Sequence, residues 1–300
     1  MQTNSRHNVF AAGPEIIAVA TRKWLPPPAI DSHLLLFIHG FTANGDYFLE
    51  FAEYFAAMGY CCAIYNYDSY VGIDAAGRSL GQLLEPYEDE VGRYGFAFIC
   101  HSMGGLVARY TLRLLSPKLK QSVEGLVTLG TPHRGALYNR RLVSFVLDSS
   151  EAVAGSIHPF LRLPLCKSAA QLTRSDDAEL LSHLATAEGI PVLSISGGLA
   201  FLELGEPGVF SRVRNRVLQR LIDEKVNDGL VGESSSDYTR AVSGEVQGVT
   251  HLKDYEGWPQ TNHTNLIHRQ DLANKIQRWL RSNERQKDRA QPKLPALPGG

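Results

Sequence analysis

The sequence lacks any long apolar run, although 44% of its 300 residues are hydrophobic. A membrane-spanning helix needs about 18 consecutive apolar residues, whereas the longest runs here, such as Leu34–Ile38, have the length of a strand. The N-terminal residues contain Pro14 and no continuous apolar segment, which is not the pattern of a secretory signal. We therefore expect neither a transmembrane segment nor a signal peptide.

The sequence also lacks an excess of charge of one sign. Its 30 Lys and Arg residues stand against 31 Asp and Glu residues, which gives a formal net charge of -1. Basic and acidic residues are interspersed, so no basic face attracts nucleic acid or an anionic membrane. We expect no nucleic-acid partner, and only a transient contact with a membrane interface stays open.

Cysteine is scarce, and the four present are Cys61, Cys62, Cys100 and Cys166. None has the spacing of metal ligands or of a disulfide framework. The first three fall in predicted buried strands, where a free cysteine behaves as a small hydrophobic residue. We therefore predict no metal site, and a reduced, cytoplasmic setting.

The pattern that is present is an apolar strand, a turn and an amphipathic helix, repeated along the chain. This alternation predicts an α/β fold with a mainly parallel sheet flanked by helices. The predicted strands are Glu15–Thr21, His33–Ile38, Tyr60–Tyr65, Phe96–Cys100, Val123–Leu129, Pro191–Ser196 and Val246–Thr250. The predicted helices are Tyr47–Met58, one that begins near Ser102 and is stopped by Pro117, and Asn265–Arg281.

Residues 1–282 are predicted to form one domain with two long interruptions. Residues 135–187 and 199–226 are too long for ordinary connections in a compact α/β domain, so we expect a helical cap or lid. The second interruption ends in an Arg-rich predicted helix, Ser211–Lys225. Residues 283–300 are charged and rich in proline, which predicts a disordered tail.

The segment Phe96–Gly105 carries the most chemical information. An apolar strand runs directly into Ser102, which small residues flank and a predicted helix follows. Such a turn strains the serine backbone and exposes its hydroxyl at the end of the sheet. The residues resemble the nucleophile elbow of α/β-hydrolases, G-x-S-x-G, except that Cys100 replaces the first glycine. Ser102 is the predicted nucleophile, and the Met103 amide is a predicted oxyanion donor at the helix N-terminus.

A second motif is a buried strand that ends in His39-Gly-Phe41. In the resembled fold, this loop supplies the other oxyanion donor through a backbone N–H. Gly40 lets the backbone approach the substrate closely, so we predict that the Phe41 amide is this donor. We interpret His39 as a structural imidazole that holds the loop.

A third motif, Leu129–Ala136, reads Leu-Gly-Thr-Pro-His-Arg-Gly-Ala. With the two preceding motifs, it is similar to the lipase and serine esterase branch of the α/β-hydrolase superfamily, and the resemblance extends from about Leu34 to Leu280. It implies the α/β-hydrolase fold. We interpret His133 of this motif as structural, because it precedes the cap.

The acid and the base should follow the serine in that order, as the resembled fold has them. Asp228 lies in Asn-Asp-Gly-Leu-Val, which is similar to a segment of bacterial lipases, and it is the predicted acid. Asp68, Asp237 and Asp254 lack either the order or the context. Some relatives in this branch bind a structural calcium near the acid, but no carboxylate cluster here demands one.

Three late histidines compete for the role of base. His251 directly follows the last predicted strand, His263 precedes the final predicted helix, and His268 lies within that helix, where we expect a surface or packing role. Lipase-like hydrolases often carry Asn-His, a polar residue and then the closing helix. The resemblance therefore favours His263, and His251 remains the main alternative.

Together these residues predict a serine hydrolase of carboxylic esters that needs no cofactor. Its catalytic residues are Ser102, Asp228 and His263, and its oxyanion donors are Phe41 and Met103. The alternatives are an acyltransferase, a deacylase or thioesterase acting on a lipid-modified substrate, and a non-catalytic binding protein of the same fold. A nucleotide-binding protein is disfavoured because residues 39–45 have neither P-loop nor dinucleotide spacing.

The substrate is only outlined by the sequence. The apolar cap residues, namely Tyr138, Phe145, Phe160, Leu161 and Leu163, form either an acyl-binding pocket or the cap's own core. We expect an ester with a medium or long acyl chain, with triacylglycerols and phospholipids among the candidates.

Overall fold

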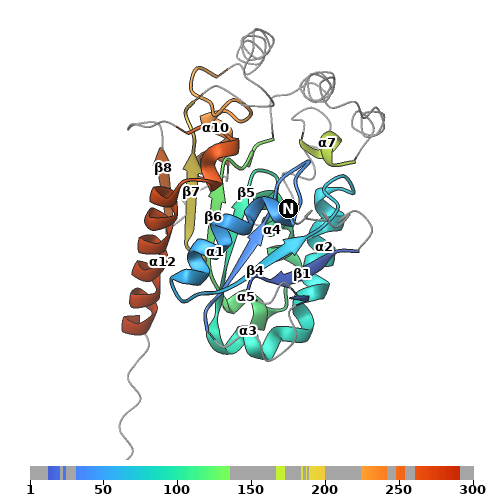
Figure 1. Ribbon diagram of the computed structural model, residues 1–300, viewed down its shortest axis with the longest axis vertical. Coiled ribbons are helices and arrows are strands. Elements are labelled where there is room, and N and C mark those ends of the chain that lie inside the picture. Colours follow the sequence, from blue (N-terminus) through green and yellow to red (C-terminus); the bar gives the residue numbers. More distant parts are fainter. Residues whose placement is uncertain are drawn as a thin grey trace, which may run out of the picture.

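The computed structural model describes residues 13–20, 23–24, 32–135, 167–172, 184, 187, 189–199, 224–241, 248–253 and 261–290. Among them, eight strands form one sheet in the order β2-β1-β4-β3-β5-β6-β7-β8 (Figure 1). The strands are β1 (Glu15–Ala18), β2 (Lys23–Trp24), β3 (Leu34–Ile38), β4 (Cys61–Asn66), β5 (Phe96–His101), β6 (Val123–Leu129), β7 (Val192–Ser196) and β8 (Val249–Lys253).

The sheet is mainly parallel, as predicted. Strands β4, β3, β5, β6, β7 and β8 pair in parallel, while β1 pairs antiparallel with both β2 and β4. The carboxyl ends of the parallel strands therefore meet at one edge of the sheet, the upper edge in Figure 1. The segments with the predicted site residues follow these strand ends.

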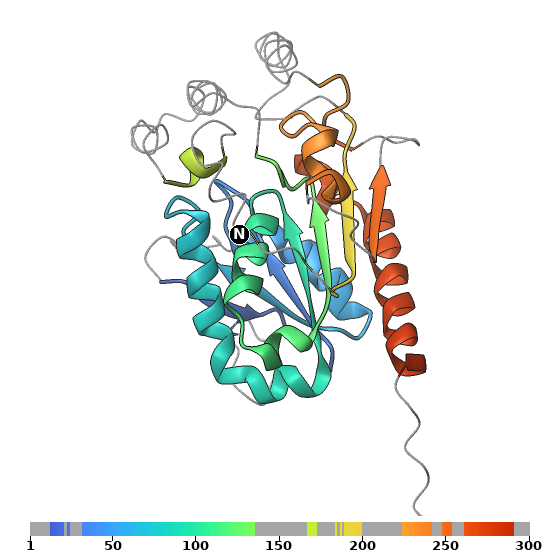
Figure 2. The same ribbon diagram turned by 180° about the vertical axis from the view of Figure 1, so that it is seen from behind.

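Helices cover both faces of the sheet because its central strands are apolar on both faces. In β3, Leu34, Leu36 and Ile38 pack on one face, while Leu35 and Phe37 pack on the other. The first face is covered by α2 (Ile73–Leu84), α4 (Gly104–Leu114) and α5 (Pro117–Gln121), and the second by α1 (Leu49–Ala57) and α12 (Gln270–Ala290), as Figures 1 and 2 show. Full burial of a Leu, Ile or Phe side chain, as in β3, stabilises the fold by about 1.5–3 kcal/mol.

Helix α2 was not predicted from the sequence, although its buried residues Ile73, Ala76, Leu80 and Leu84 have helical spacing. Glycines interrupt the pattern and lower its helix propensity. One of them has a packing reason: a Cβ atom on Gly77 would lie 2.8 Å from the Tyr110 ring of α4. The glycine lets the two helices approach closely.

All the predicted strands overlap observed ones, and Val123–Leu129 matches at both ends. The ends of the others differ, and β2 was missed. The last strand lies three positions later than predicted, at Val249–Lys253, so His251 is inside it and not after it. This edge strand contains only partly buried and exposed residues, so no continuous apolar run marks its bounds. The first strand ends at Ala18 and not at Thr21.

Two helix boundaries also differ from the predictions. Pro117 does not stop α4, which ends at Leu114; it starts α5, whose N-cap Ser116 accepts a hydrogen bond from the Leu119 amide. Helix α12 continues to Ala290, eight residues into the tail for which disorder was predicted. Glu, Arg, Gln and Lys in this stretch are good helix formers.

Part of the first interruption is described, and it docks on α2. Helix α7 (Lys167–Leu172) supplies Ser168 Oγ, which accepts a hydrogen bond from the Gly72 amide at 2.9 Å. Gln171 Oε1 accepts one from the Ile73 amide at 2.6 Å, so α7 satisfies the first amides of α2. Most other cap residues, including the predicted helix Ser211–Lys225 and the named apolar side chains, lie outside the described residues, as do Cys166 and Asp254.

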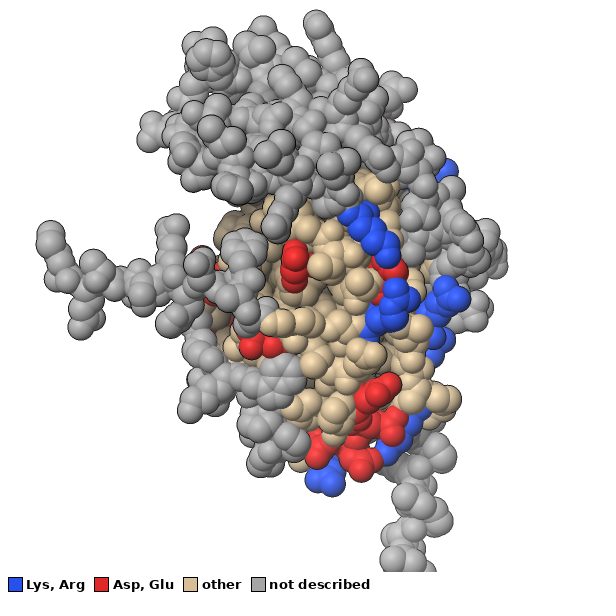
Figure 3. Space-filling model, turned by 90° about the vertical axis from the view of Figure 1, so that its right-hand side faces the viewer, with Lys and Arg blue, Asp and Glu red and all other residues tan. Residues whose placement is uncertain are grey.

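The surface of the described residues carries both signs of charge. Figure 3 shows basic and acidic side chains on the same face, with acidic ones gathered at its lower end. None of the described helices is both long and apolar enough to cross a membrane.

Candidate active site

The elbow at the end of β5 has the strained geometry predicted for it. Ser102 has a φ of 53°, a backbone conformation that residues other than glycine rarely adopt and that costs about 1–2 kcal/mol. Its amide donates a hydrogen bond to the Leu129 carbonyl at 2.9 Å, which fixes the turn against β6. Ser102 is half-buried, whereas His101 and Met103 on either side of it are buried.

The glycine after the serine is required by the close approach of α4 to β3. A Cβ atom on Gly104 would collide with the Ile38 carbonyl oxygen and lie 2.8 Å from that of His39. Cys100, at the position where the resembled motif has its first glycine, is fully buried in the apolar core, and this burial raises the pKa of its thiol. It is therefore a neutral core residue.

The loop after β3 lies against the elbow. A Cβ atom on Gly40 would be 2.8 Å from Ser102 Cβ, so glycine permits this contact. Phe41 follows and is half-buried, with its ring edge-on to Tyr70 at 5.3 Å. Met103 is the N-cap of α4 and its side chain is buried. Both predicted oxyanion donors therefore border Ser102 or the glycine that contacts it.

His39 is held within this loop by two main-chain contacts. Its Nδ1–H donates to the Gly40 carbonyl at 3.0 Å, and its Nε2 accepts from the Tyr67 amide at 3.4 Å. The ring stacks on Tyr67 at 4.2 Å. Burial lowers the pKa of His39 from 6.5 to about 4, so the imidazole is neutral. These contacts support the structural interpretation of His39.

Asp228 and His263 are brought together from distant segments. His263 Nδ1 lies 2.8 Å from Asp228 Oδ2, and because a carboxylate only accepts, Nδ1 carries the proton. Asp228 Oδ1 accepts from the amides of Leu230 and Val231 at 3.0 and 2.7 Å. The His263 amide also donates to the Asp228 carbonyl at 2.8 Å. Asp228 is 1% exposed and His263 4%, so water does not screen this pair.

Gly130 places this pair beside the elbow, and sequence reasoning did not single it out. It follows Leu129, whose carbonyl accepts a hydrogen bond from the Ser102 amide. Gly130 has a φ of 59°, and a Cβ atom there would lie 2.8 Å from Asp228 Oδ2 and 3.0 Å from His263 Nδ1. The Leu-Gly-Thr segment of the third motif was the available signal for its role.

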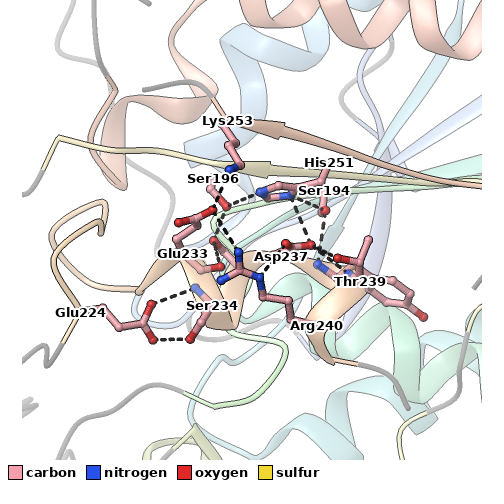
Figure 4. Close-up of polar contacts among 12 residues, drawn as sticks. Ser194, Ser196, Glu224, Glu233, Ser234, Asp237, Thr239, Arg240, His251 and Lys253 are labelled. Atoms are coloured by element: carbon pink, nitrogen blue, oxygen red, sulfur yellow. Dashed lines mark hydrogen bonds and ion pairs between the residues drawn. The ribbon is translucent and has the colours of Figure 1, made fainter. Parts of the chain in front are cut away.

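His251 lies in a different polar cluster (Figure 4). Its Nδ1 is 2.8 Å from Ser194 Oγ and its Nε2 3.4 Å from Ser196 Oγ. Among the described residues, Asp237 approaches Nδ1 to 3.8 Å, and it also pairs with Arg240 at 3.3 Å. The predicted acid Asp228 therefore lies against His263, whereas His251 has other polar neighbours.

Two further histidines also have structural surroundings. His133 is buried, with Nε2 3.1 Å from Thr128 Oγ1 and its ring edge-on to Tyr238. His268 is exposed between η5 (Thr264–Ile267) and α12. Within the described part of the chain, no group of three or more His, Cys, Asp or Glu side chains is placed to hold a metal ion.

Known proteins are similar to this chain in both sequence and fold. In sequence, it is 31% identical over 98 residues to "Putative esterase/lipase 3" of Mycoplasma pneumoniae. The matched segment is 32% of this chain and only 35% of that protein. In structure, it is similar to the mature lipase BlEst2 of Bacillus licheniformis, with a TM-score of 0.57 and 18% identity over 85% of this chain and 94% of that one.

A lipase-esterase related protein from Clostridium acetobutylicum is also similar, with a TM-score of 0.53 and 14% identity over 89% of this chain and 100% of that one. These structures show that the fold is that of the α/β-hydrolases. A family model described as "Putative serine esterase (DUF676)" matches residues 29–189, more than half of the 300-residue chain. The chain therefore belongs to this serine esterase family.

Proposed function

We propose that the chain is a carboxylic ester hydrolase in which Ser102 is the nucleophile, His263 the base and Asp228 the acid. The observation that carries the proposal is the buried hydrogen bond of 2.8 Å between His263 Nδ1 and Asp228 Oδ2. Both side chains pack on Gly130, next to the residue that fixes the Ser102 turn. These contacts support a site in which nucleophile, base and acid act together at one edge of the sheet.

The tautomer of His263 decides which nitrogen reacts. Since Asp228 holds the proton on Nδ1, the free lone pair is on Nε2. As Ser102 Oγ attacks the acyl carbonyl carbon, Nε2 takes the hydroxyl proton. The imidazolium that forms is stabilised by the Asp228 carboxylate, which itself stays ionised.

The negative charge on the former carbonyl oxygen is held by the Phe41 and Met103 amides, and loss of one such donor typically costs about 3 kcal/mol. The tetrahedral intermediate then collapses, and the alcohol leaves with the proton from His263. Water next attacks the acyl-Ser102 ester, giving its proton to Nε2, and the carboxylic acid is released with Ser102 restored. These steps use no cofactor.

The proposed substrate is an ester with a medium or long acyl chain. The half-buried Phe41 ring against Tyr70 provides an apolar surface beside the oxyanion loop. Two proteins of similar structure are described as a lipase and as a metagenomic carboxyl esterase, and these descriptions are compatible with an ester substrate. Transfer of the acyl group to an alcohol, or cleavage of a thioester, would use the same residues and is separated by the products.

The first test is labelling with a fluorophosphonate, which reacts with an activated serine. We expect labelling of wild type and of the control Ser116→Ala, which changes the N-cap of α5, but no labelling of Ser102→Ala. Melting temperatures of all three proteins check folding. Persistent labelling of Ser102→Ala would exclude the proposed nucleophile.

The second test is hydrolysis of p-nitrophenyl esters of increasing acyl length, together with an acyl thioester. We expect the highest kcat/KM at medium or long chains and slower cleavage of the thioester. Adding a primary alcohol and measuring the ratio of ester to acid product distinguishes hydrolysis from transfer. A predominant ester product in dilute alcohol would contradict the proposed use of water.

A further inference from the structure

His101, the last residue of β5, is a buried histidine in contact with the proposed base. It is 4% exposed and directly precedes Ser102. Its Nε2 lies 2.8 Å from the His263 carbonyl oxygen, and the two rings are 4.7 Å apart. From the sequence, we predict no role for His101 beyond its place in the elbow.

The contacts of His101 determine its protonation. A carbonyl oxygen only accepts, so the Nε2 atom carries the proton. The Nδ1 atom is buried, and no partner for it exists among the described residues. Burial above all, and then repulsion from His263, lower the pKa of His101 well below its usual value. The side chain is therefore a neutral imidazole with one donor in use and one acceptor unused.

An unused buried acceptor costs about 1–3 kcal/mol of stability, so an apolar residue would be a cheaper way to fill this space. The cost is understandable if the donor on the other side of the ring has a task. That donor holds the carbonyl of His263, while the His263 amide is held by the Asp228 carbonyl at 2.8 Å. The main chain of His263 is thus fixed on both sides.

We propose that His101 is a positioning residue for the base: its Nε2–H anchors the His263 main chain, and its uncharged ring supports the His263 imidazole. The inference rests on the proposed function, in which His263 becomes an imidazolium during each turnover. A cationic side chain 4.7 Å away would oppose that charge. A neutral imidazole donates the hydrogen bond without this penalty.

The test compares two substitutions at His101 with the same two at a matched histidine. Gln keeps an N–H near the position of Nε2, whereas Met fills the space without a donor. His133 is the control because it is also buried and neutral, and its Nδ1 likewise has no partner among the described residues, but its Nε2 contacts Thr128. Loss of either histidine should destabilise the fold alike, whereas only His101 contacts the base.

We expect kcat of His101→Met to fall about 10- to 100-fold, as a small displacement of a catalytic group does, while KM changes less than about threefold. His101→Gln should recover most of the lost kcat. His133→Met and His133→Gln should keep kcat within about threefold of wild type. Equal losses for Gln and Met at position 101, or a wild-type kcat in His101→Met, would overturn the proposal.

An NMR measurement makes the test independent of activity. In Ser102→Ala protein labelled with 15N-histidine, we expect His101 to carry its proton on Nε2. The low-field proton of the His263 Nδ1–H···Asp228 bond should persist with His101→Gln and broaden or vanish with His101→Met. A proton on Nδ1 of His101, or an unchanged signal in His101→Met, would refute positioning, whether or not the wild type cleaves esters.

Discussion

His263 and His251 occupy similar places in the chain but different electrostatic surroundings. Each histidine lies near a carboxylate that arises from residues 224–241. Asp228 approaches His263 to 2.8 Å, and its second oxygen is held by two main-chain amides. Asp237 is 3.8 Å from His251 and shares its charge with Arg240 and with the Thr239 amide and hydroxyl.

The difference lies in what else the carboxylate does. Neutral amides orient Asp228 without cancelling its charge, so the full negative charge acts on the imidazole. An arginine at 3.3 Å offsets the charge of Asp237, and its histidine instead joins the hydroxyls of Ser194 and Ser196 (Figure 4). The first arrangement suits a proton carrier and the second a structural contact between β7 and β8.

We expect the largest difference between the two sites when each imidazole is removed in turn. His263→Ala should lower kcat by about five orders of magnitude, because the proposed base is lost. His251→Ala should change kcat less than about tenfold while it lowers the melting temperature. Ester hydrolysis by the two purified variants, each checked by circular dichroism, measures this; an inactive His251→Ala beside an active His263→Ala would reverse the assignment.

Exchanging each carboxylate for an amide should produce the next largest effect. In Asp228→Asn, the amide group can donate to Nδ1 and so stabilise the wrong tautomer, and kcat should fall about 10⁴-fold. Asp237→Asn should leave kcat within about tenfold of wild type. Comparable losses in the two variants would show that the carboxylate at His263 has no special role.

Much of the nucleophile side of the site could be predicted from the sequence. The strand before Ser102 is a continuous apolar run, and Gly40 and Gly104 stand where the loop after β3 and the elbow approach closely. Strain and close approach leave a mark in the residue type at one position, namely glycine. The elbow and the loop after β3 were therefore visible without any knowledge of distant contacts.

The acid and base side was less accessible, for a physical reason. His251 and His263 both come after Asp228 in the chain, and the contact of His263 with Asp228, far away in the sequence, distinguishes them in the structure. No local pattern encodes that contact. Strand β8 has no fully buried residue, so its sequence did not show that His251 lies inside a strand. The contact of His101 was missed because its partner is a main-chain carbonyl, and every residue type has one.

A third prediction tests the spacing around His263. Gly130→Ala should lower kcat about 10- to 100-fold, because its Cβ would push against the Asp228–His263 pair. The control Gly189→Ala has a similar φ of 74° and no atom within 4 Å of its Cβ. It should cost about 1–2 kcal/mol of stability through strain alone and leave kcat unchanged. Equal activity of both variants would contradict the close packing.

The smallest effect concerns the histidines that stay neutral, and it is one of stability and not of rate. Burial lowers the pKa of His39 from 6.5 to about 4, so between these pH values the unfolded chain binds a proton that the folded chain does not. The free energy of unfolding should therefore decrease as the pH falls from 6.5 to 4, by up to about 1.4 kcal/mol per pH unit for one proton.

His39→Gln should flatten this slope, because the proton difference at that site disappears. His251→Gln should flatten it less. Burial lowers the pKa of His251 too, but the carboxylates of Asp237 and Glu233 oppose the shift. Urea unfolding at intervals between pH 7 and 4 gives both slopes. A larger loss of slope in His251→Gln than in His39→Gln would contradict this order, because His39 is fully buried whereas His251 is only partly buried on the edge strand.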